Sequence, residues 1–271
     1  MYTAAASFLD ARAHGGRWLL RIEDVDGPRV LPGASERIVR TLERFGFEWD
    51  GEILRQQHRA GEYAAALRSL QQRGLTFECT CSRSQLQDED RYPGTCRELA
   101  RPGGSDTATR LRAQPGFIVF SDEIQGIYRQ DVAAAVGDLV LKRRDQVFAY
   151  LLAVVVDDAA EGITHVVRGA DLLDNTPRQI HLQRCLGVAT PRYAHVPVLS
   201  EPDGSKLAKS RRSVRADSAA PLAQLLSVFS LLGLKPPKEL NSAGLDECWS
   251  WAVANWDKNT VPKRLNLRLT A

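Results

Sequence analysis

The sequence predicts an α/β protein with a doubly wound parallel sheet, interrupted by a cysteine-bearing insertion and followed by a helical C-terminal subdomain. Amphipathic helices alternate with short apolar strands over residues 3–79, a pattern typical of such a sheet. Residues 79–116 break this pattern, because they are polar and rich in Cys, Gly, Pro and Arg. From about residue 217 apolar residues recur at helical spacing, which indicates helices at this end.

The expected elements of the first part follow from apolar spacing and from glycines at helix ends. Ile38, Val39 and Leu42 recur at helical spacing, and Gly46 closes their helix. In order, the sequence predicts a helix over residues 3–13 ended by Gly15 and Gly16, a strand over 17–22 with an acidic turn at 23–26, helices over 35–45 and 62–72, and a strand over 75–79.

The later elements continue the alternation beyond the insertion. Thr176 is expected to cap a helix that has Pro177 at its first position. In order, the sequence predicts strands over 117–120 and 139–142, a helix from Phe148, a strand over 164–168, a helix over 176–186, a strand over 194–199, and helices around 222–229 and 245–256. The tryptophans at 249, 251 and 256 are expected in a core or an interface.

The bulk composition is that of an ordinary globular protein. The 271 residues are 44% hydrophobic and 25% charged, and the net charge of +3 permits a nucleic-acid partner without requiring one. The longest apolar run, Val147–Val156, is too short to span a bilayer, and the chain shows no signal-peptide pattern. Since five cysteines is an odd number, a reduced compartment is favoured. We therefore expect a cytoplasmic protein without a membrane segment.

Three cysteines, Cys79, Cys81 and Cys96, lie close together in the polar insertion. Thiolates suit Zn²⁺, which takes four ligands in a tetrahedron. The fourth ligand is open: Tyr92 is one candidate, and Asp88, Glu89, Asp90 or water are others. Three free, partly buried thiols are the simpler alternative. A polar segment of this length needs a staple to stay ordered, which favours the metal.

A basic segment follows Asp203, Gly204 and Ser205. Residues 206–215 carry five cations and no acid. The usual role of such a run is a solvated turn. A glycine hinge and flexible lysines, Lys206 and Lys209, would also let this loop close over a triphosphate and stabilise charge on leaving pyrophosphate. Taken alone, the segment leaves both interpretations open.

Glu23, Tyr150 and Arg168 each lie near the end of an expected element. Ligands of doubly wound sheets bind beyond the carboxyl ends of the strands, where Glu23 and Arg168 are expected. An acid, an arginine and a phenol together could hold a zwitterion that has an additional carboxylate. For each residue singly, a structural ion pair or a capping contact is the more common role.

In combination these residues resemble the glutamyl-tRNA synthetase group of class I aminoacyl-tRNA synthetases. The similarity extends from residue 1 to about residue 215. It rests on residues 21–26 with Pro28 and Arg29, on Cys79, Cys81, Tyr92 and Cys96, and on residues 137–138, 144–145, 148–150, 156–158, 162–173, 176–180 and 203–210.

This resemblance implies roles for the residues singled out above. Glu23 would hold the α-ammonium group of L-glutamate, while Tyr150 and Arg168 would line its pocket, with Arg168 facing a carboxylate. Lys209 matches the second lysine of the group's K-M-S-K-S loop and would act on the ATP phosphates together with Lys206 and, we expect, Mg²⁺. Cys79, Cys81, Tyr92 and Cys96 match the group's structural zinc ligands, which favours tyrosine as the fourth ligand.

The resemblance also implies a reaction and a domain plan. The chain is most similar to the short member of the group, which lacks an anticodon-binding domain and, as a ligase, transfers glutamate to the queuosine base of tRNA(Asp). We expect a monomer whose α/β domain spans 1–78 and 161–215, with a zinc-bearing, acceptor-binding-like insertion over 79–160 and a helical subdomain over 216–271. The alternatives are a truncated synthetase that charges tRNA(Glu), and a catalytically impaired tRNA- or nucleotide-binding homologue.

Three departures from the group stand out. The chain begins inside the helix that follows the group's H-I-G-H-type signature, so about two dozen residues with the first strand are expected to be absent, which would leave open strand edges. We therefore expect weak or no adenylate formation from residues 1–271. Ala208 replaces the usual serine of the lysine loop, and Gln146 stands where glycine is common.

Overall fold

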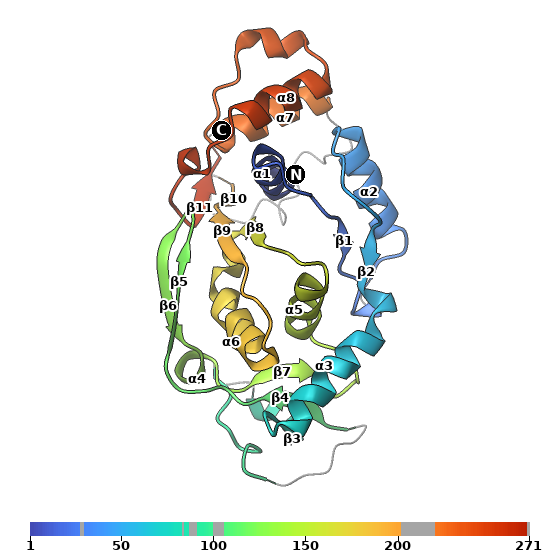
Figure 1. Cartoon of the computed structure of the whole chain (residues 1–271), viewed down its shortest axis with the longest axis vertical. Coiled ribbons are helices and arrows are strands. Elements are labelled where there is room, and N and C mark those ends of the chain that lie inside the picture. Colours follow the sequence, from blue (N-terminus) through green and yellow to red (C-terminus); the bar gives the residue numbers. More distant parts are fainter. Residues whose placement is uncertain (28–29, 83, 87–90, 100–105, 202–219, 270–271) are drawn as a thin grey trace.

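A computed structural model describes residues 1–27, 30–82, 84–86, 91–99, 106–201 and 220–269 of the chain. The molecule is elongated, with two C-terminal helices at one end and a small antiparallel sheet at the other (Figure 1). In the described part of the chain, no helix is both long and apolar enough to cross a membrane.

Eight α-helices occur in the described residues, and most match the predicted ones. The helix over 176–186 shows why: proline lies in its first turn, and Gly187 follows it with φ 73°, a backbone conformation that favours glycine. The helices are α1 (Tyr2–Ala13), α2 (Ala34–Arg44), α3 (Ala60–Gln72), α4 (Val132–Ala135), α5 (Tyr150–Ala160), α6 (Thr176–Leu186), α7 (Pro221–Leu231) and α8 (Leu245–Ala254).

Eleven short strands occur in the same residues. They are β1 (Arg21–Ile22), β2 (Leu54–Arg55), β3 (Thr76–Cys79), β4 (Ala108–Leu111), β5 (Phe117–Asp122), β6 (Gly126–Asp131), β7 (Leu139–Lys142), β8 (His165–Gly169), β9 (Arg192–Val196), β10 (Val198–Ser200) and β11 (Asn266–Arg268). The expected strand over 194–199 is divided into β9 and β10 at Pro197, which has no N–H to donate to a ladder.

The strands form four sheets rather than the single parallel sheet that the sequence predicts. β8, β9 and β5 pair in parallel and β6 continues them antiparallel, in the order β6-β5-β9-β8. β1 pairs in parallel with β2, and β10 with β11. β3, β4 and β7 form an antiparallel sheet. Within the described residues β1 and β8 each lie at the edge of a sheet, with one strand partner.

The prediction of a polar insertion over 79–116 missed strand β4. All four residues of β4 are buried although two of them, Thr109 and Arg110, are polar. Arg110 is tolerated there because its guanidinium lies 3.8 Å from the ring centroid of Tyr92 and donates a hydrogen bond to the Asp138 carbonyl. Because Thr109 and Arg110 are polar, the sequence pattern did not predict this buried strand.

The largest core joins α1 to the C-terminal helices. Phe8 of α1 packs on Trp18, Phe47 and Trp249, with ring centroids 4.7–5.4 Å apart. The indole of Trp249 donates to the Phe45 carbonyl at 2.9 Å. The predicted core position of Trp249 is confirmed, and Trp251 and Trp256 pack partly buried against the same cluster. This core holds β8 and β9 from one side.

A second core lies between α3, α5 and α6. Leu67, Leu152 and Leu182, one from each helix, are buried in it. Asp157 of α5 is fully buried yet satisfied, since it accepts hydrogen bonds from Gln56, Arg59 and Tyr63. These contacts fix α5, whose first residue is Tyr150, against α3.

Candidate active site

Arg168 lies near the end of β8, as the sequence predicts, and is 8% exposed. Its Nε donates to His195 Nε2 at 3.1 Å and its Nη2 to Thr176 Oγ1 at 2.9 Å. The predicted capping role of Thr176 is wrong: α6 has no side-chain cap, and the Thr176 hydroxyl serves Arg168 instead. Two fixed acceptors, His195 Nε2 and Thr176 Oγ1, orient the guanidinium plane.

His195 is the partner of Arg168 in the parallel register of β8 and β9. Its Nδ1 lies 2.5 Å from Asp122 Oδ2, and both side chains are fully buried. Because arginine Nε only donates, His195 Nε2 must accept, so the ring proton is on Nδ1 and points at Asp122. Burial lowers the pKa of His195, which favours this neutral tautomer.

Asp122 closes this network at the end of β5. Its Oδ1 accepts the backbone N–H groups of Ile124, Gln125 and His195 at 2.8–3.1 Å, which leaves Oδ2 for the imidazole. Burial tends to raise the pKa of Asp122, but the hydrogen bonds from His195 and Gln125 outweigh it and lower this pKa. Sequence reasoning missed Asp122 and His195, since their contact depends on strand register.

Tyr150 and Glu23 lie at a more open position than Arg168. Tyr150 is 38% exposed and the side chain of Glu23 is 39% exposed. Burial and the charge of Glu23 raise the pKa of Tyr150 to about 12, against the opposing charge of Arg168. Burial raises the pKa of Glu23, against the charges of Arg21 and Arg168. The structure therefore brings Glu23, Tyr150 and Arg168 within electrostatic reach of one another.

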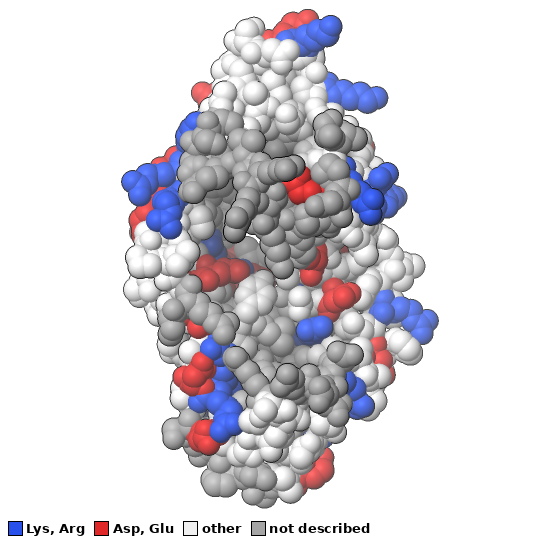
Figure 2. All heavy atoms as spheres, turned by 180° about the vertical axis from the view of Figure 1, so that it is seen from behind, with Lys and Arg blue, Asp and Glu red and all other residues white. Residues whose placement is uncertain are grey.

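Arg21 adds a cation that the sequence argument did not assign. Its guanidinium pairs with Asp158 at 2.7 Å, with Glu161 at 3.1 Å and with Glu23 at 3.3 Å. The signal was present, because Arg21 and Glu23 are two apart and share one face of an extended segment. Figure 2 shows acidic side chains in the hollowed middle of one face and basic ones mostly towards its outline.

The predicted phosphate-binding lysines, Lys206 and Lys209, lie outside the described residues, as does the whole segment 202–219. Asp88, Glu89 and Asp90, the other candidates for a fourth metal ligand, also lie outside them.

The three cysteines of the insertion converge as predicted. The sulfur atoms of Cys79, Cys81 and Cys96 all lie within 4.8 Å of one another, and those of Cys81 and Cys96 are 3.6 Å apart. Tetrahedral zinc with bonds of about 2.3 Å places two sulfurs about 3.8 Å apart. The Tyr92 hydroxyl lies 3.4 Å from the Cys79 sulfur and accepts the Cys96 N–H at 3.0 Å. The donor set therefore fits a metal ion.

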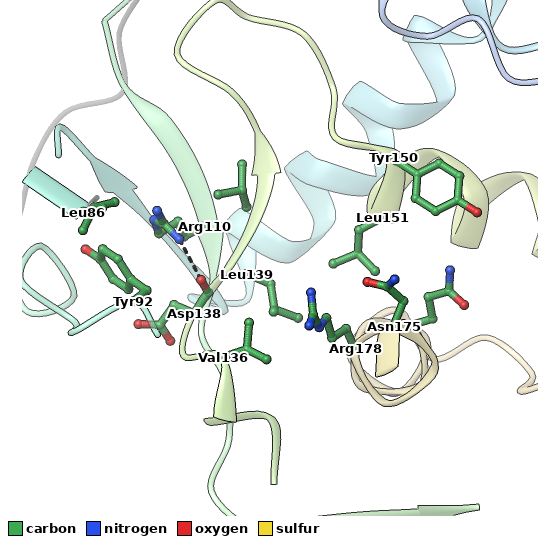
Figure 3. Close-up of a pocket in the computed structure, with 12 residues that line it drawn as sticks. Leu86, Tyr92, Arg110, Val136, Asp138, Leu139, Tyr150, Leu151, Asn175 and Arg178 are labelled. Atoms are coloured by element: carbon green, nitrogen blue, oxygen red, sulfur yellow. Dashed lines mark hydrogen bonds between the residues drawn. The ribbon is translucent and has the colours of Figure 1, made fainter. Parts of the chain in front are cut away.

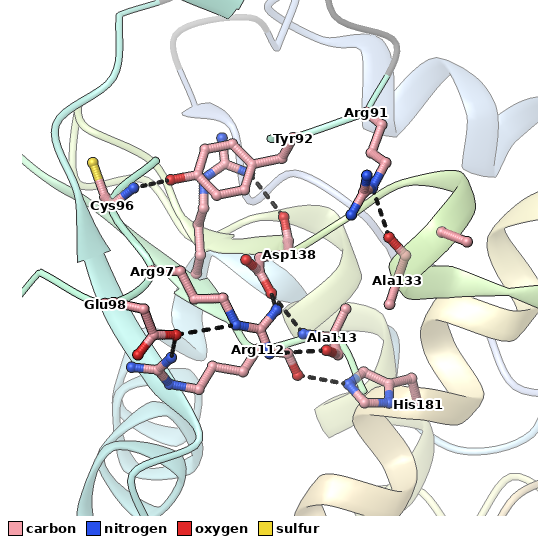
Figure 4. Close-up of polar contacts among 12 residues, drawn as sticks. Arg91, Tyr92, Cys96, Arg97, Glu98, Arg112, Ala113, Ala133, Asp138 and His181 are labelled. Carbon is pink, nitrogen blue, oxygen red and sulfur yellow. Dashed lines mark hydrogen bonds and ion pairs between the residues drawn. The ribbon is translucent and has the colours of Figure 1, made fainter. Parts of the chain in front are cut away.

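The region around the cysteines has little apolar support of its own. Its buried cluster consists of Phe77, Cys79, Tyr92 and Cys96. Polar contacts anchor the following segment (Figure 4): Asp138 accepts from Arg97 at 2.6 Å and from the Ala113 N–H at 2.8 Å. Burial tends to raise the pKa of Cys96, but hydrogen bonds from Thr80 and Cys81 lower it to about 7.

Comparison with known proteins identifies the family. The family model described as tRNA synthetases class I (E and Q), catalytic domain, matches residues 1–248. The chain belongs to this family. The resemblance to class I synthetases inferred from the motifs is thereby confirmed, and so is the inference that the chain is a ligase of this type.

Curated relatives of this synthetase chain are similar over almost its whole length. It is 53% identical over 270 residues to the glutamyl-Q tRNA(Asp) synthetase of Ectopseudomonas mendocina (strain ymp), covering 98% of this chain and 91% of that protein. It is 49% identical over 272 residues to the protein of that name from Aromatoleum aromaticum (strain DSM 19018 / LMG 30748 / EbN1), covering 98% and 86%.

A solved structure confirms the class I synthetase fold. The glutamate-tRNA synthetase of Elizabethkingia anophelis superposes with a TM-score of 0.82 at 23% identity. The match covers all of this chain and 64% of that one, so this chain spans less than two thirds of that structure.

Proposed function

We propose that this synthetase activates L-glutamate with ATP and transfers it to the queuosine base of tRNA(Asp). One observation carries the proposal. Over 98% of its length, the chain is 50–53% identical in sequence to relatives named glutamyl-Q tRNA(Asp) synthetase. The buried, doubly anchored guanidinium of Arg168 supports an acidic amino acid as substrate, because a buried arginine needs an anion.

The site residues receive the following proposed roles. Arg168 pairs with a carboxylate of glutamate, Glu23 binds its α-ammonium group, and Tyr150 lines the pocket between them. Glutamine would be rejected, since a neutral amide leaves the Arg168 guanidinium buried without its anion. Arg21 holds the Glu23 carboxylate from the other side.

The reaction has two steps. A carboxylate oxygen of glutamate bonds to the α-phosphorus of ATP, and the bond to pyrophosphate breaks. A hydroxyl oxygen of queuosine then bonds to the glutamyl carbonyl carbon, the bond from this carbon to the AMP oxygen breaks, and the hydroxyl proton passes to the released phosphate. Lys206 and Lys209 would bind the ATP phosphates, with Mg²⁺ accompanying the nucleotide.

We further propose that Cys79, Cys81, Cys96 and Tyr92 hold one structural Zn²⁺. The ion would stabilise the fold of this region, because the small local core contributes little. The division into an α/β domain (1–78 and 161–215), an insertion (79–160) and a helical subdomain (216–271) stays a prediction, as do the monomeric state and the cytoplasmic location.

The test measures ATP–pyrophosphate exchange and then maps the product. The product of the full reading frame should exchange pyrophosphate only with glutamate present, and should place labelled glutamate on the anticodon fragment of queuosine-containing tRNA(Asp) after nuclease digestion. Label at the 3′ end of tRNA(Glu) would establish the alternative synthetase. Binding of tRNA without any exchange would establish the impaired homologue.

A further inference from the structure

The C-terminal segment, residues 256–269, returns from α8 to the strands that carry the Arg168 site (Figure 1). Its strand β11 pairs in parallel with β10, and the Leu265 carbonyl accepts the Val198 N–H at 2.8 Å. β10 begins two residues after the end of β9, the strand that contains His195. Backbone hydrogen bonds therefore join the C-terminal segment to the chain that continues from His195.

Lys258 ties the C-terminal segment to two acidic side chains from distant parts of the chain. Its Nζ lies 2.5 Å from Glu123 Oε2 and 3.3 Å from Asp10 Oδ1. The side chains of Lys258, Glu123 and Asp10 are 18%, 13% and 5% exposed, so water and salt screen these pairs little. Trp256 donates to the same Asp10 oxygen at 3.0 Å. The C-terminal segment is thereby fixed to α1 and to the turn that follows β5.

The turn at residues 122–125 connects this ion-pair cluster to the proposed glutamate site. Glu123 directly follows the aspartate whose carboxylate binds His195. Gln125 Nε2 donates to the His195 carbonyl at 2.7 Å and to the Arg264 carbonyl at 3.3 Å. A single side chain therefore bridges the C-terminal segment and the histidine that orients the guanidinium of the site.

The cavity shown in Figure 3 lies apart from this connection. It has a volume of about 300 Å³ and lies between the insertion sheet and the first turns of α5 and α6, with Leu139, Tyr150 and Arg178 in its lining. Among the described residues that line it, none belongs to the C-terminal segment or to the turn at 122–125. A change at Lys258 would therefore reach the glutamate site through the turn rather than through this cavity.

We propose that Lys258 and Gln125 are positioning residues for the amino-acid substrate. They hold the turn that fixes His195, and His195 in turn orients the Arg168 guanidinium. The inference rests on the proposed function and deepens it, because the affinity for glutamate then depends on the C-terminal segment. Since these two residues act through the orientation of the guanidinium, their loss affects the KM for glutamate more than kcat.

The experiment compares Lys258→Met with Lys258→Arg and with Lys263→Met, which changes an exposed lysine of the same segment. Glutamate-dependent ATP–pyrophosphate exchange of the product of the full reading frame is measured at varied glutamate and at varied ATP. Because a partly buried ion pair is lost, the KM for glutamate should rise about fivefold in Lys258→Met, while the KM for ATP and kcat stay near their unsubstituted values.

The other two variants show whether the charge is responsible. Lys258→Arg should recover most of the affinity for glutamate, and Lys263→Met should match the unsubstituted protein. An unchanged KM for glutamate in Lys258→Met overturns the inference. A fall confined to kcat overturns it as well, since loss of folded protein alone would give that result.

A second variant and a spectroscopic signal keep the result interpretable if Lys258→Met is unstable. Gln125→Met removes both donated hydrogen bonds at similar volume and should raise the KM for glutamate about threefold. The Nδ1 proton of His195, held 2.5 Å from Asp122, should give a proton resonance far downfield. This resonance should shift or broaden in Lys258→Met and Gln125→Met but not in Lys263→Met, and an unaltered resonance in both variants contradicts the inference.

The same measurements separate this inference from the proposed function. Absence of glutamate-dependent exchange in the unsubstituted protein would refute the proposed function. The His195 resonance would still show whether the C-terminal segment fixes this histidine, because it requires no substrate.

Discussion

The Arg168 site and the cysteine cluster are ordered by different means. Arg168, His195 and Asp122 form a chain of hydrogen bonds whose members are at most 8% exposed, between two large apolar cores. The cysteines converge equally closely, but four residues make up the buried cluster around them. We infer that the protein itself holds the first geometry, whereas the proposed zinc ion would hold the second.

The largest effect is expected at the cysteine cluster. Cys96→Ser should remove the bound zinc and destabilise the insertion, because metal loss costs about 4 kcal/mol or more. That corresponds to about 10 °C in melting temperature for a chain of this size. Metal content by mass spectrometry and thermal unfolding measure both quantities.

The control for this variant is Cys185→Ser, which changes a half-buried thiol outside the cluster. It should keep both the zinc and the melting temperature. Exchange should decline less than transfer in Cys96→Ser, since the Arg168 network does not include the insertion cysteines. A fully stable, metal-free Cys96→Ser protein would contradict the contrast between the two regions.

Arg168→Gln tests the Arg168 site. The substitution removes the charge that we propose faces the substrate carboxylate. Because a hydrogen bond to a charged group would be lost, kcat/KM for glutamate should fall about 100-fold. Steady-state exchange kinetics measure this. Arg40→Gln, an exposed arginine on α2, is the control. Unaltered glutamate kinetics in Arg168→Gln would remove this residue from the site.

Asp122→Asn should have a smaller effect of about tenfold on the KM for glutamate. Because Oδ1 binds three backbone N–H groups, the new amide nitrogen replaces Oδ2 and faces His195 Nδ1 as a donor. His195 must then carry its proton on Nε2. Two donors, His195 Nε2–H and Arg168 Nε–H, would then face each other, so the Arg168 guanidinium loses its orientation. Asp131→Asn, at the far end of the β5–β6 hairpin, should leave this KM unchanged.

The sequence was sufficient for features whose signal is local. Cys79, Cys81 and Cys96 were recognisable from close spacing, and Glu23 and Arg168 from strands ending in charged residues. Asp122 and His195 were not, because 73 residues separate them and only the β5–β9 and β8–β9 pairing brings them together.

The sheet arrangement shows the same limit. Six apolar segments were predicted as strands, but β2, β4, β6 and β11 were not. Which strands pair depends on contacts far apart in the chain. One local feature was recognisable from the sequence. Gln146 stands where glycine is common in the family, and it adopts φ 66°, a backbone conformation that favours glycine.

The pH dependence of stability distinguishes the two regions further. The folded pKa of His195 lies below its ordinary value of 6.5, so below pH 6.5 the unfolded state binds more protons and stability falls as pH falls. Asp122, whose folded pKa is also lowered, loses its contribution only below pH 3.8.

His195→Gln should reduce the slope of unfolding free energy against pH, measured by urea unfolding between about pH 6.5 and pH 5. His181, also buried with a lowered pKa, contributes in the same window, so His181→Gln calibrates the change. An unaltered slope in His195→Gln would show that the pKa of His195 does not differ between the folded and unfolded states.

The smallest effect is expected at Gln146, in the turn that joins β7 of the insertion sheet to α5. A residue other than glycine at φ 66° costs about 1–2 kcal/mol, while glycine loses about 0.5–1 kcal/mol of entropy, so Gln146→Gly should stabilise the protein by about 0.5 kcal/mol. The gain is limited because Gln146 also accepts a hydrogen bond from Lys142 at 2.6 Å.

Urea unfolding measures the change in the free energy of unfolding. Gln125→Gly, at a position without this backbone conformation, should destabilise the protein instead. Since Tyr150 begins the helix that follows, an unchanged KM for glutamate would show that this turn adjusts stability without transmitting strain to the Arg168 site.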